Sequence, residues 1–255
     1  MKFENKVAIV TGAGSGMGQS VAIEAAAKGI KVVAADINEG GLQETIATIK
    51  DHNGEATYYV YDACKIDEAQ ALCQFTVQEY GGIDYTCYSA GIQTYGTAVD
   101  TDEELWDRTH NVNVKGMFLL AKFCIPEMRK RGGGAIVHVS SVQAFVCQSN
   151  VVAYASSKGA AVSLTRAMAL DHAKDGIRIN SVCPGSIDTP MLQWGAAQHG
   201  DAQEVISEWG SKHPIGRVGK AEEVAKTVLF LWSDDAGFIT AQPIVIDGGL
   251  ISGVF

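Results

Sequence analysis

A serine, a tyrosine and a lysine stand in the sequence at a spacing that suits proton transfer. Ser141 follows an apolar run at 134–139 that is rich in β-branched residues and predicts a strand. Tyr154 and Lys158 lie four residues apart in a stretch, 151–174, whose apolar residues recur at helical spacing. Both side chains therefore project from one helix face, one turn apart. We expect the three groups to meet in a site that moves a proton to or from a hydroxyl group.

A tyrosine needs help from its surroundings to act as a base near neutral pH, because its ordinary pKa is about 10. An ammonium group one helical turn away, on Lys158, together with the positive charge of an oxidised cofactor, is expected to favour the phenolate and to lower the pKa of Tyr154. We hypothesise that Tyr154 is the general base for alcohol oxidation and the general acid for ketone reduction. Ser141 would hold the substrate oxygen. Taken singly, the simpler interpretations are a tyrosine packed on the sheet and a lysine on a solvated face.

A glycine-rich turn near the start of the chain indicates a second kind of chemistry. Residues 11–18 read Thr-Gly-Ala-Gly-Ser-Gly-Met-Gly, after a short apolar strand at 6–10 and before a helix at about 17–28 and a strand at 31–35. Strand, glycine turn, helix and strand within about thirty residues form the context of a dinucleotide site. Glycines let the backbone approach a phosphate, and the start of the helix offers unpaired N–H groups. The spacing is T-G-x-x-x-G-x-G, not G-x-G-x-x-G.

Asp36, at the end of the second strand, indicates which dinucleotide is bound. A carboxylate there accepts hydrogen bonds from the adenosine ribose hydroxyls and repels a 2′-phosphate. The next residues, Ile37 and Asn38, add no cation that would attract such a phosphate. The sequence therefore favours NAD over NADP.

The composition is that of a folded enzyme-sized domain. The chain has 255 residues, of which 47% are hydrophobic and 19% charged, and its formal charge is −9. This charge argues against nucleic acid and anionic membranes as partners, and no apolar run reaches membrane-spanning length. The start of the chain lacks a signal-peptide core. Six cysteines without C-x-x-C spacing predict reduced thiols and no metal site, so we expect a cytoplasmic protein.

Strands and helices alternate along the rest of the chain without a linker or a repeat. Further helices are expected at 42–50, 66–79, 101–129 and 221–232, and strands at 56–61, 83–88, 177–182 and 243–246. Thr101, with Glu104 three residues later, is expected to cap the long helix as a capping box. This alternation predicts an α/β fold with a parallel sheet covered by helices on both faces.

The collected residues resemble the classical short-chain dehydrogenase/reductase family over essentially the whole chain. The matching positions are Thr11, Gly12, Gly16, Gly18, Asp62, Ala90, Gly91, Asn113, Ser141, Tyr154, Lys158, Pro184, Gly185 and the late Asp247-Gly-Gly249. The resemblance implies a single Rossmann-type domain over 1–255, with a doubly wound, seven-stranded parallel sheet, and a homotetramer or, less often, a dimer. One departure stands out: Tyr88-Ser89 replaces the Asn-Asn that commonly precedes Ala-Gly, so the strand-stabilising role of the first asparagine must be met otherwise or lost.

The resemblance also implies roles for individual residues. Asn113 would support a water that leads from Lys158 to solvent, and Lys158 would hold the nicotinamide ribose, whose oxidised ring adds positive charge beside Tyr154. The remaining cofactor contacts would come from the glycine turn, from three strand ends and from the loop after the sixth strand, namely Gly12, Ser15, Gly16, Met17, Gly18, Asp36, Ile37, Asp62, Ala63, Ser89, Ala90, Gly91, Pro184, Gly185, Ile187 and Thr189.

The substrate pocket is expected between two less regular stretches. Residues 189–213 are interpreted as an irregular lid, with Met191, Leu192 and Trp194 on its apolar side. Gln143 and Gln148 add amide groups to the opposite wall, a mixture that fits a small sugar, a polyol or a cyclic alcohol. The apolar end of the chain, 250–255, is expected at a subunit interface, near a neighbouring pocket.

Three functions remain open at this point. The first is an NAD-dependent dehydrogenase of a small secondary alcohol or lactol. The second is a reductase of carrier-bound 3-ketoacyl groups, against which Asp36 argues because biosynthetic reductions more often use NADPH. The third is an NAD-sensing binding protein without turnover, against which the complete Ser141, Tyr154 and Lys158 set argues.

Several other polar residues have simpler interpretations. His138 is expected to be a satisfied residue of its strand, and His110 to lack partners at metal-binding spacing. The cations at 129–131 suit the end of a helix. Ser156 and Ser157 are interpreted as packing and helix-surface residues.

Overall fold

A seven-stranded parallel sheet forms the centre of the computed structural model, which describes residues 3–253. The strand order is β3-β2-β1-β4-β5-β6-β9, and every neighbouring pair is parallel. The order reverses between β1 and β4, which in doubly wound folds is where a crevice opens at the carboxyl ends of the strands. The strands run over Val7–Thr11 (β1), Lys31–Asp36 (β2), Ala56–Val60 (β3), Tyr85–Tyr88 (β4), Gly134–Val139 (β5), Ile177–Pro184 (β6) and Pro243–Ile246 (β9).

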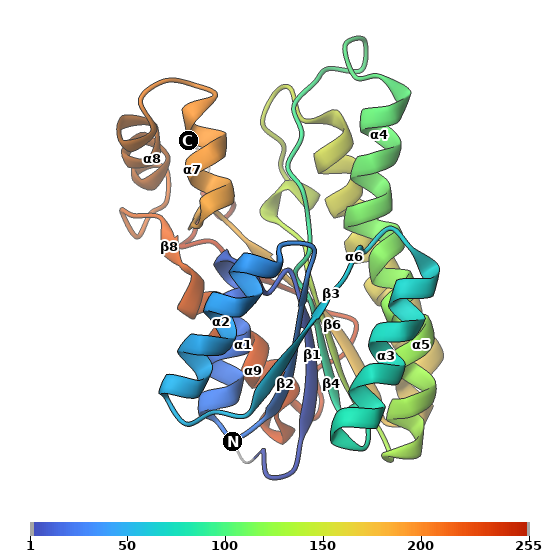
Figure 1. Cartoon of the computed structure of the whole chain (residues 1–255). Coiled ribbons are helices and arrows are strands. Elements are labelled where there is room, and N and C mark those ends of the chain that lie inside the picture. Colours follow the sequence, from blue (N-terminus) through green and yellow to red (C-terminus); the bar gives the residue numbers. More distant parts are fainter. Residues whose placement is uncertain (1–2, 254–255) are drawn as a thin grey trace.

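Helices cover both faces of this Rossmann-type sheet (Figure 1). On one face lie α1 (Gly16–Ala27), α2 (Glu39–Asp51) and α9 (Ala221–Trp232), which share a core cluster that includes Val21, Leu42 and Val224. On the other face lie α3 (Ile66–Tyr80), α5 (Gly116–Lys130) and α6 (Val152–His172), around a second cluster. Strands buried on both faces read as continuous apolar runs, as β1 and β2 do. Both the fold class and the two-sided covering are as predicted.

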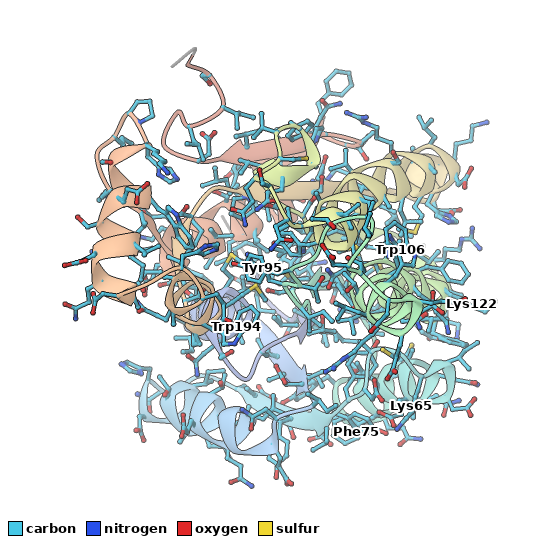
Figure 2. All side chains as sticks on the ribbon, turned by 90° about the horizontal axis from the view of Figure 1, so that it is seen from above. Lys65, Phe75, Tyr95, Trp106, Lys122 and Trp194 are labelled. Carbon is cyan, nitrogen blue, oxygen red and sulfur yellow. The ribbon has the colours of Figure 1, made fainter. Side chains whose placement is uncertain are left out.

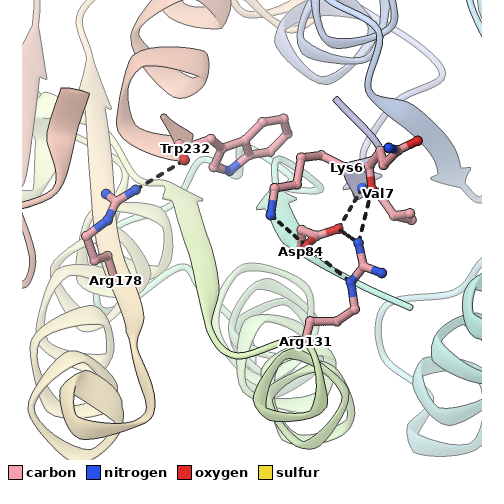
Figure 3. A network of polar contacts seen from close by, with 7 residues as sticks. Lys6, Val7, Asp84, Arg131, Arg178 and Trp232 are labelled. Carbon is pink, nitrogen blue, oxygen red and sulfur yellow. Dashed lines mark hydrogen bonds and ion pairs between the residues drawn. The ribbon is translucent and has the colours of Figure 1, made fainter. Parts of the chain in front are cut away.

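A buried carboxylate holds the amino-terminal edge of the sheet together (Figure 3). Asp84, which is 2% exposed, accepts hydrogen bonds from Lys6 Nζ at 3.1 Å, from the Val7 amide at 2.9 Å and from Arg131 Nη2 at 2.8 Å. On the other side, Arg178 donates from Nη1 to the carbonyl of Leu231 at the end of α9. These contacts lie away from the crevice, at the opposite ends of the strands.

The long helix expected at 101–129 is divided into three parts. It consists of α4 (Glu103–His110), a five-residue π-helix η1 (Asn111–Lys115) and α5. The predicted cap was wrong: Asp102 caps α4, because its Oδ1 accepts from the Leu105 amide at 2.7 Å, whereas Thr101 Oγ1 donates to the Thr97 carbonyl. The carboxylate of Asp102, one residue later, takes the capping position that the sequence pattern assigned to the threonine.

The segment expected to be irregular is helical. Residues 189–213 contain α7 (Pro190–Ala197) and α8 (Ala202–Ser211), capped by Thr189 and Asp201. Proline at the first position of α7 and both capping residues are ordinary start signals of helices. A small two-stranded sheet of β7 (Ile187–Asp188) and β8 (Gly219–Lys220) flanks this helix pair. In Figure 1, α7 and α8 extend beyond the sheet at the same end as α4.

Short one-turn helices complete the chain: η2 (Val142–Ala144), η3 (Ala173–Asp175) and η4 (Asp234–Ala236). None of the helices within residues 3–253 combines the length and apolarity that crossing a membrane requires.

Candidate active site

A cleft of about 440 Å³ opens at the carboxyl ends of the strands, at the point where the strand order reverses. Most of the residues expected to hold the cofactor line it, namely Gly12, Ser15, Gly16, Met17, Asp36, Ile37, Asp62, Ala63, Ser89, Ala90, Gly91 and Thr189. Gly18, Pro184, Gly185 and Ile187 are not among its lining residues. Tyr61, Cys64, Arg108, Val112 and Met191 line it although the sequence reasoning did not assign them to the cofactor.

The glycine turn leaves room at the start of α1 for a phosphate group. Gly12 and Gly16 have φ of +66° and +57°, and a β-carbon at Gly12 would lie 2.7 Å from the Ala90 amide nitrogen. Ser15, the N-cap residue, is extended and makes no side-chain capping bond within the described chain, so the first amides of α1 face the cleft without that partner. Gly18 allows α1 to pack closely against the turn, since a β-carbon at this position would lie 2.1 Å from the Gly12 carbonyl oxygen. The residues present therefore fit a dinucleotide pyrophosphate.

Asp36 presents a fixed carboxylate to the same cleft. Its Oδ2 accepts from the Gly14 amide at 3.0 Å and its Oδ1 from the Asn38 amide at 2.9 Å. Each oxygen keeps further acceptor capacity for a ribose hydroxyl. Asp62, beside it in the cleft, accepts from the Cys64 amide at 3.0 Å, and this bond holds the pKa of Asp62 below its usual value.

Lys158 is buried beneath the carboxyl end of β5. It is 5% exposed, its Nζ donates to the Val139 carbonyl at 3.0 Å, and the same atom lies 5.5 Å from the centroid of the Tyr154 ring. Burial lowers the pKa of Lys158 to about 8. A β-carbon at Gly91 would lie 3.6 Å from Nζ, so the ammonium also borders the cleft.

The hydroxyl of Tyr154 lies in surroundings that disfavour its charged form. Burial raises its pKa to about 12, and a hydrogen bond with Ser141 opposes that shift only in part. Burial dominates because Tyr154 is 8% exposed and loses the water that would stabilise a phenolate. In the protein alone, the protonated form of Tyr154 is therefore favoured. The lowering expected from Lys158 together with an oxidised nicotinamide ring stays a prediction.

Asn113, in the π-helix, is fully buried and joins three segments of the site. Its Nδ2 donates to the Ile92 carbonyl at 2.9 Å and to Ser157 Oγ at 3.0 Å, and its Oδ1 accepts from the Ile92 amide at 2.9 Å. Ser157 Oγ in turn donates to the Tyr154 carbonyl at 2.7 Å. Ser157 is thus a link between Asn113 and α6, beyond the packing role expected for it.

A second cavity, of about 480 Å³, adjoins Ser141 and Tyr154. Gln143, Gln148 and Leu192 line it as expected for a substrate pocket, whereas Met191 lines the cofactor cleft and Trp194 packs on Tyr95, with ring centroids 5.8 Å apart (Figure 2). Val146 and Cys147, between the two glutamines of the expected wall, line it as well. Residues that were not singled out from the sequence complete the walls, among them Gln93, Gly185, Ser186, Trp209, Lys212 and His213.

The end of the chain contributes to this same cavity. Leu250, Ile251 and Gly253 line it within one subunit, where a neighbouring pocket had been expected. Asp247 fixes this turn, because its carboxylate accepts from the amides of Gly249 and Ile251, each at 2.8 Å. The part of that expectation that concerns residues 254 and 255 lies outside the described chain.

His138 and His110, which were given simple interpretations, make local contacts within the described chain. His138 is buried in β5 and shares a 2.9 Å hydrogen bond with Thr165 Oγ1, while burial lowers its pKa to about 4. His110 stacks on Trp106. All six cysteines are free thiols, and residues 3–253 contain no group of histidine, cysteine and carboxylate side chains that could hold a metal ion.

The chain matches known proteins over almost its whole length. A family model described as enoyl-(acyl carrier protein) reductase matches residues 12–251. The chain is 38% identical over 254 residues to a cyclohexanol dehydrogenase of an Acinetobacter species, covering 98% of this chain and 97% of the relative. It is 37% identical to a 3-oxoacyl-[acyl-carrier-protein] reductase of Thermotoga maritima, covering 98% and 100%. Among solved structures, the aldohexose dehydrogenase of Thermoplasma acidophilum matches with a TM-score of 0.91 and 35% identity, covering 99% and 96%.

Proposed function

The chain belongs to the classical short-chain dehydrogenase/reductase family, and we propose that it is an NAD-dependent oxidoreductase that interconverts a secondary alcohol and a ketone, or a lactol and a lactone. The observation that carries this proposal is the position of the buried Ser141, Tyr154 and Lys158 set. Ser141 and Tyr154 line the substrate cavity, while Lys158 Nζ borders the neighbouring cleft at Gly91. One set of side chains thus reaches both cavities.

The proposed mechanism assigns a role to each of these groups. Ser141 donates a hydrogen bond to the substrate oxygen, and Tyr154 Oη takes the hydroxyl proton during oxidation and returns it during reduction. Lys158 places its ammonium nitrogen 5.5 Å from the centroid of the tyrosine ring, where a positive charge would favour the phenolate. A bound nicotinamide dinucleotide supplies the hydride-transfer chemistry, and in its oxidised form a second positive charge.

Asn113 acts as a clamp in this proposal. Both hydrogens of its amide are engaged, with Ile92 and Ser157, so its side chain is committed to holding the Gly91–Ile92 turn against α6. Any water that leads from Lys158 to solvent would then be bound by the backbone near Asn113. In this way Asn113 would support the water that the resemblance implies.

The preference for NAD rests on Asp36. Its carboxylate lies in the cleft, fixed by the amides of Gly14 and Asn38, and would repel a 2′-phosphate. The contacts proposed for the rest of the cofactor are with the turn Gly12–Gly18, with Asp62 and Ala63, with Ser89 to Gly91, and with Ile187 and Thr189 after Pro184-Gly185.

The proposed substrate is a small sugar, polyol or cyclic alcohol. Gln93, Gln143 and Gln148 bring three amide groups to a cavity whose other walls are Val146, Trp209 and the end of the chain. Such a mixture suits a ring or short chain that carries several oxygens. Related proteins named for cyclohexanol and for aldohexose support this range.

A carrier-bound 3-ketoacyl reductase is the second candidate, supported by the 37% identity to an enzyme of that name. Asp36 argues against it, as does the position of Leu250, Ile251 and Gly253, which occupy part of the cavity wall that a carrier-bound chain would need to pass. The third candidate function is an NAD sensor without turnover. Such a protein would have no need of a buried lysine beside Tyr154 whose pKa is lowered by burial, so Lys158 argues against it. We further propose a homotetramer in the cytoplasm, in which exposed apolar side chains such as Phe118 on α5 and Leu170 on α6 become covered.

A panel of alcohols tested with NAD and with NADP, followed by the absorbance of the reduced cofactor, tests the proposal. We expect turnover of a polyhydroxylated or cyclic alcohol with NAD. Preference for NADP would contradict the role of Asp36. Binding of NAD without turnover across the panel would support the sensor, and rapid reduction of 3-ketoacyl thioesters would support the second candidate.

A further inference from the structure

The π-helix that carries Asn113 has an unusual hydrogen-bond register. The Gly116 amide donates to the carbonyl of Asn111, five residues earlier. In a regular α-helix it would donate to Val112, four residues earlier. The Val112 carbonyl instead accepts from Tyr88 Oη at 2.6 Å. A side chain from a neighbouring strand thus occupies the carbonyl that α-helical geometry would give to Gly116.

Tyr88 is suited to this contact by its burial. It is the last residue of β4, and its side chain is 1% exposed within the core cluster between the sheet and α5. Burial raises the pKa of Tyr88, so its hydroxyl keeps its proton and remains a donor. A desolvated hydroxyl without a partner is costly, so the contact with Val112 stabilises both the strand end and the π-helix.

Gly116 leaves the space that the Tyr88 hydroxyl occupies. A β-carbon at Gly116 would lie 2.0 Å from Tyr88 Oη and 2.9 Å from its Cζ. No side chain can therefore stand at position 116 while the Tyr88 hydroxyl is in place. Tyr88 is also the residue at which the chain departs from the Asn-Asn-Ala-Gly pattern noted above.

The π-helix determines where Asn113 points. One residue more per turn changes the direction of the following side chains by about 100° relative to an α-helix. In the observed register Asn113 faces inward and clamps Ile92 to Ser157, whose Oγ binds the Tyr154 carbonyl. A continuous set of contacts thus leads from Tyr88 through Val112 and Asn113 to Tyr154.

We propose that Tyr88 is a positioning residue, which acts through the π-helix to hold Asn113, and through it Tyr154 and Lys158, in the geometry for proton transfer. Tyr88 and Gly116 form a coupled pair, because the Tyr88 hydroxyl requires a residue without a β-carbon at position 116. The catalytic consequence rests on the proposed function; the effect on the π-helix does not.

The first test is Tyr88→Phe, which removes one hydroxyl from a buried ring. We expect kcat to fall on the order of tenfold, with the Kd of NAD and the KM of the alcohol within about threefold, because one buried hydrogen bond is lost away from both ligands. Hydrogen exchange of peptides that span 111–117 should become faster. Tyr85→Phe is the matched control, since Tyr85 is on the same strand but stacks on Trp232 in the other core cluster and should behave as wild type.

The second test is the coupling between the two residues. Gly116→Ala alone should lower the melting temperature and disturb exchange at 111–117. Combined with Tyr88→Phe, which removes the oxygen that the new methyl group would meet, the same change should cost less stability than in the wild-type background. Equal costs in the two backgrounds would show that Tyr88 and Gly116 are independent.

The outcomes separate this inference from the proposed function. Unchanged exchange at 111–117 in Tyr88→Phe overturns the positioning role, whether or not kcat falls. A wild-type protein that turns over no alcohol contradicts the proposed function, and the exchange and stability results then decide the effect of Tyr88 on the π-helix alone. Faster exchange with an unchanged kcat in an active enzyme contradicts the proposed link to proton transfer.

Discussion

The ammonium group of Lys158 donates a hydrogen bond to the carbonyl of Val139, at 3.0 Å. Val139 ends β5, two residues before Ser141, and Lys158 follows Tyr154 by one turn of α6. The single contact therefore fixes the helix that carries the tyrosine against the strand end that carries the serine. It also keeps a charged group almost fully buried, which has consequences for stability.

Replacement of Lys158 by methionine should stabilise the protein at neutral pH while abolishing turnover. Burial lowers the pKa of Lys158 from 10.5 to about 8, a shift worth up to about 3 kcal/mol of unfolding free energy. Below pH 8 the lysine is charged in both states and the full cost is present. Between pH 8 and 10.5 the folded state has fewer protons bound than the unfolded state, so wild-type stability rises with pH. The advantage of Lys158→Met should thus shrink towards pH 10.5.

Urea unfolding at pH 7 and at pH 10 measures this difference. Lys122→Met, at an exposed position on α5, is the control and should change stability by less than about 0.5 kcal/mol. If Lys158→Met has no larger unfolding free energy than the wild type at pH 7, or if its advantage grows with pH, the buried charge of Lys158 is not destabilising.

Replacement of Asp36 by asparagine should reduce the discrimination between the two dinucleotides. The change keeps acceptor capacity for the amides of Gly14 and Asn38 but removes the negative charge. We expect the Kd of NAD to rise on the order of tenfold, as for loss of a hydrogen bond to a charged group, and that of NADP to fall. Titration calorimetry with both cofactors measures the ratio, with Asp51→Asn at the exposed end of α2 as the control. An unchanged ratio would remove Asp36 from cofactor selection.

Replacement of Asp84 by asparagine should affect stability but not catalysis. Its carboxylate is buried and accepts from Lys6, Val7 and Arg131, so its neutral counterpart leaves cations without their partner. We expect a loss of about 3 kcal/mol in unfolding free energy. The control, Glu127→Gln, breaks an exposed pair with Lys130 and should cost less than about 1 kcal/mol. Asp84 lies at the amino-terminal ends of the strands, whereas the candidate active site lies at their carboxyl ends. A large drop in kcat at a temperature where the variant is folded would therefore contradict a purely structural role for Asp84.

Replacement of Gln143 by leucine should change which alcohols are preferred. Gln143 lines the substrate cavity, and its buried Oε1 has no hydrogen-bond partner within the described chain. Leucine has similar size but no polar group, so kcat/KM for a polyhydroxylated alcohol should fall, relative to that for a cyclic alcohol with one hydroxyl, by about tenfold or more. Gln70→Leu, exposed on α3, serves as control. Equal effects on both substrates would mean that Gln143 does not contribute to selectivity.

Patterns that depend on neighbours in the sequence could be predicted well. Alternating apolar strands and helices gave the parallel sheet, and β5, β9 and α9 begin and end where expected. The glycine turn and the spacing of Tyr154 and Lys158 led to the two cavities, because strand ends of a parallel sheet meet at one edge.

Features that depend on contacts between distant segments could not be predicted in the same way. The π-helix that carries Asn113 receives a hydrogen bond at the Val112 carbonyl from Tyr88, which is twenty-four residues before Val112 in the chain. The raised pKa of Tyr154 depends on how completely the folded chain excludes water there. Likewise, Met191, Leu192 and Trp194 lie on the helix α7, which was not predicted, and point in different directions from it. Of these three residues only Leu192 lines the substrate cavity.

The proton-transfer role of Tyr154 is the central claim, and Tyr154→Phe tests it most directly. The change keeps the buried ring and removes only the hydroxyl. With an alcohol that the wild type oxidises, kcat should fall by about a thousandfold, while titration calorimetry should give a Kd for NAD within about twofold of the wild-type value. Turnover close to that of the wild type, with NAD still bound, would show that the proton leaves the substrate by another route.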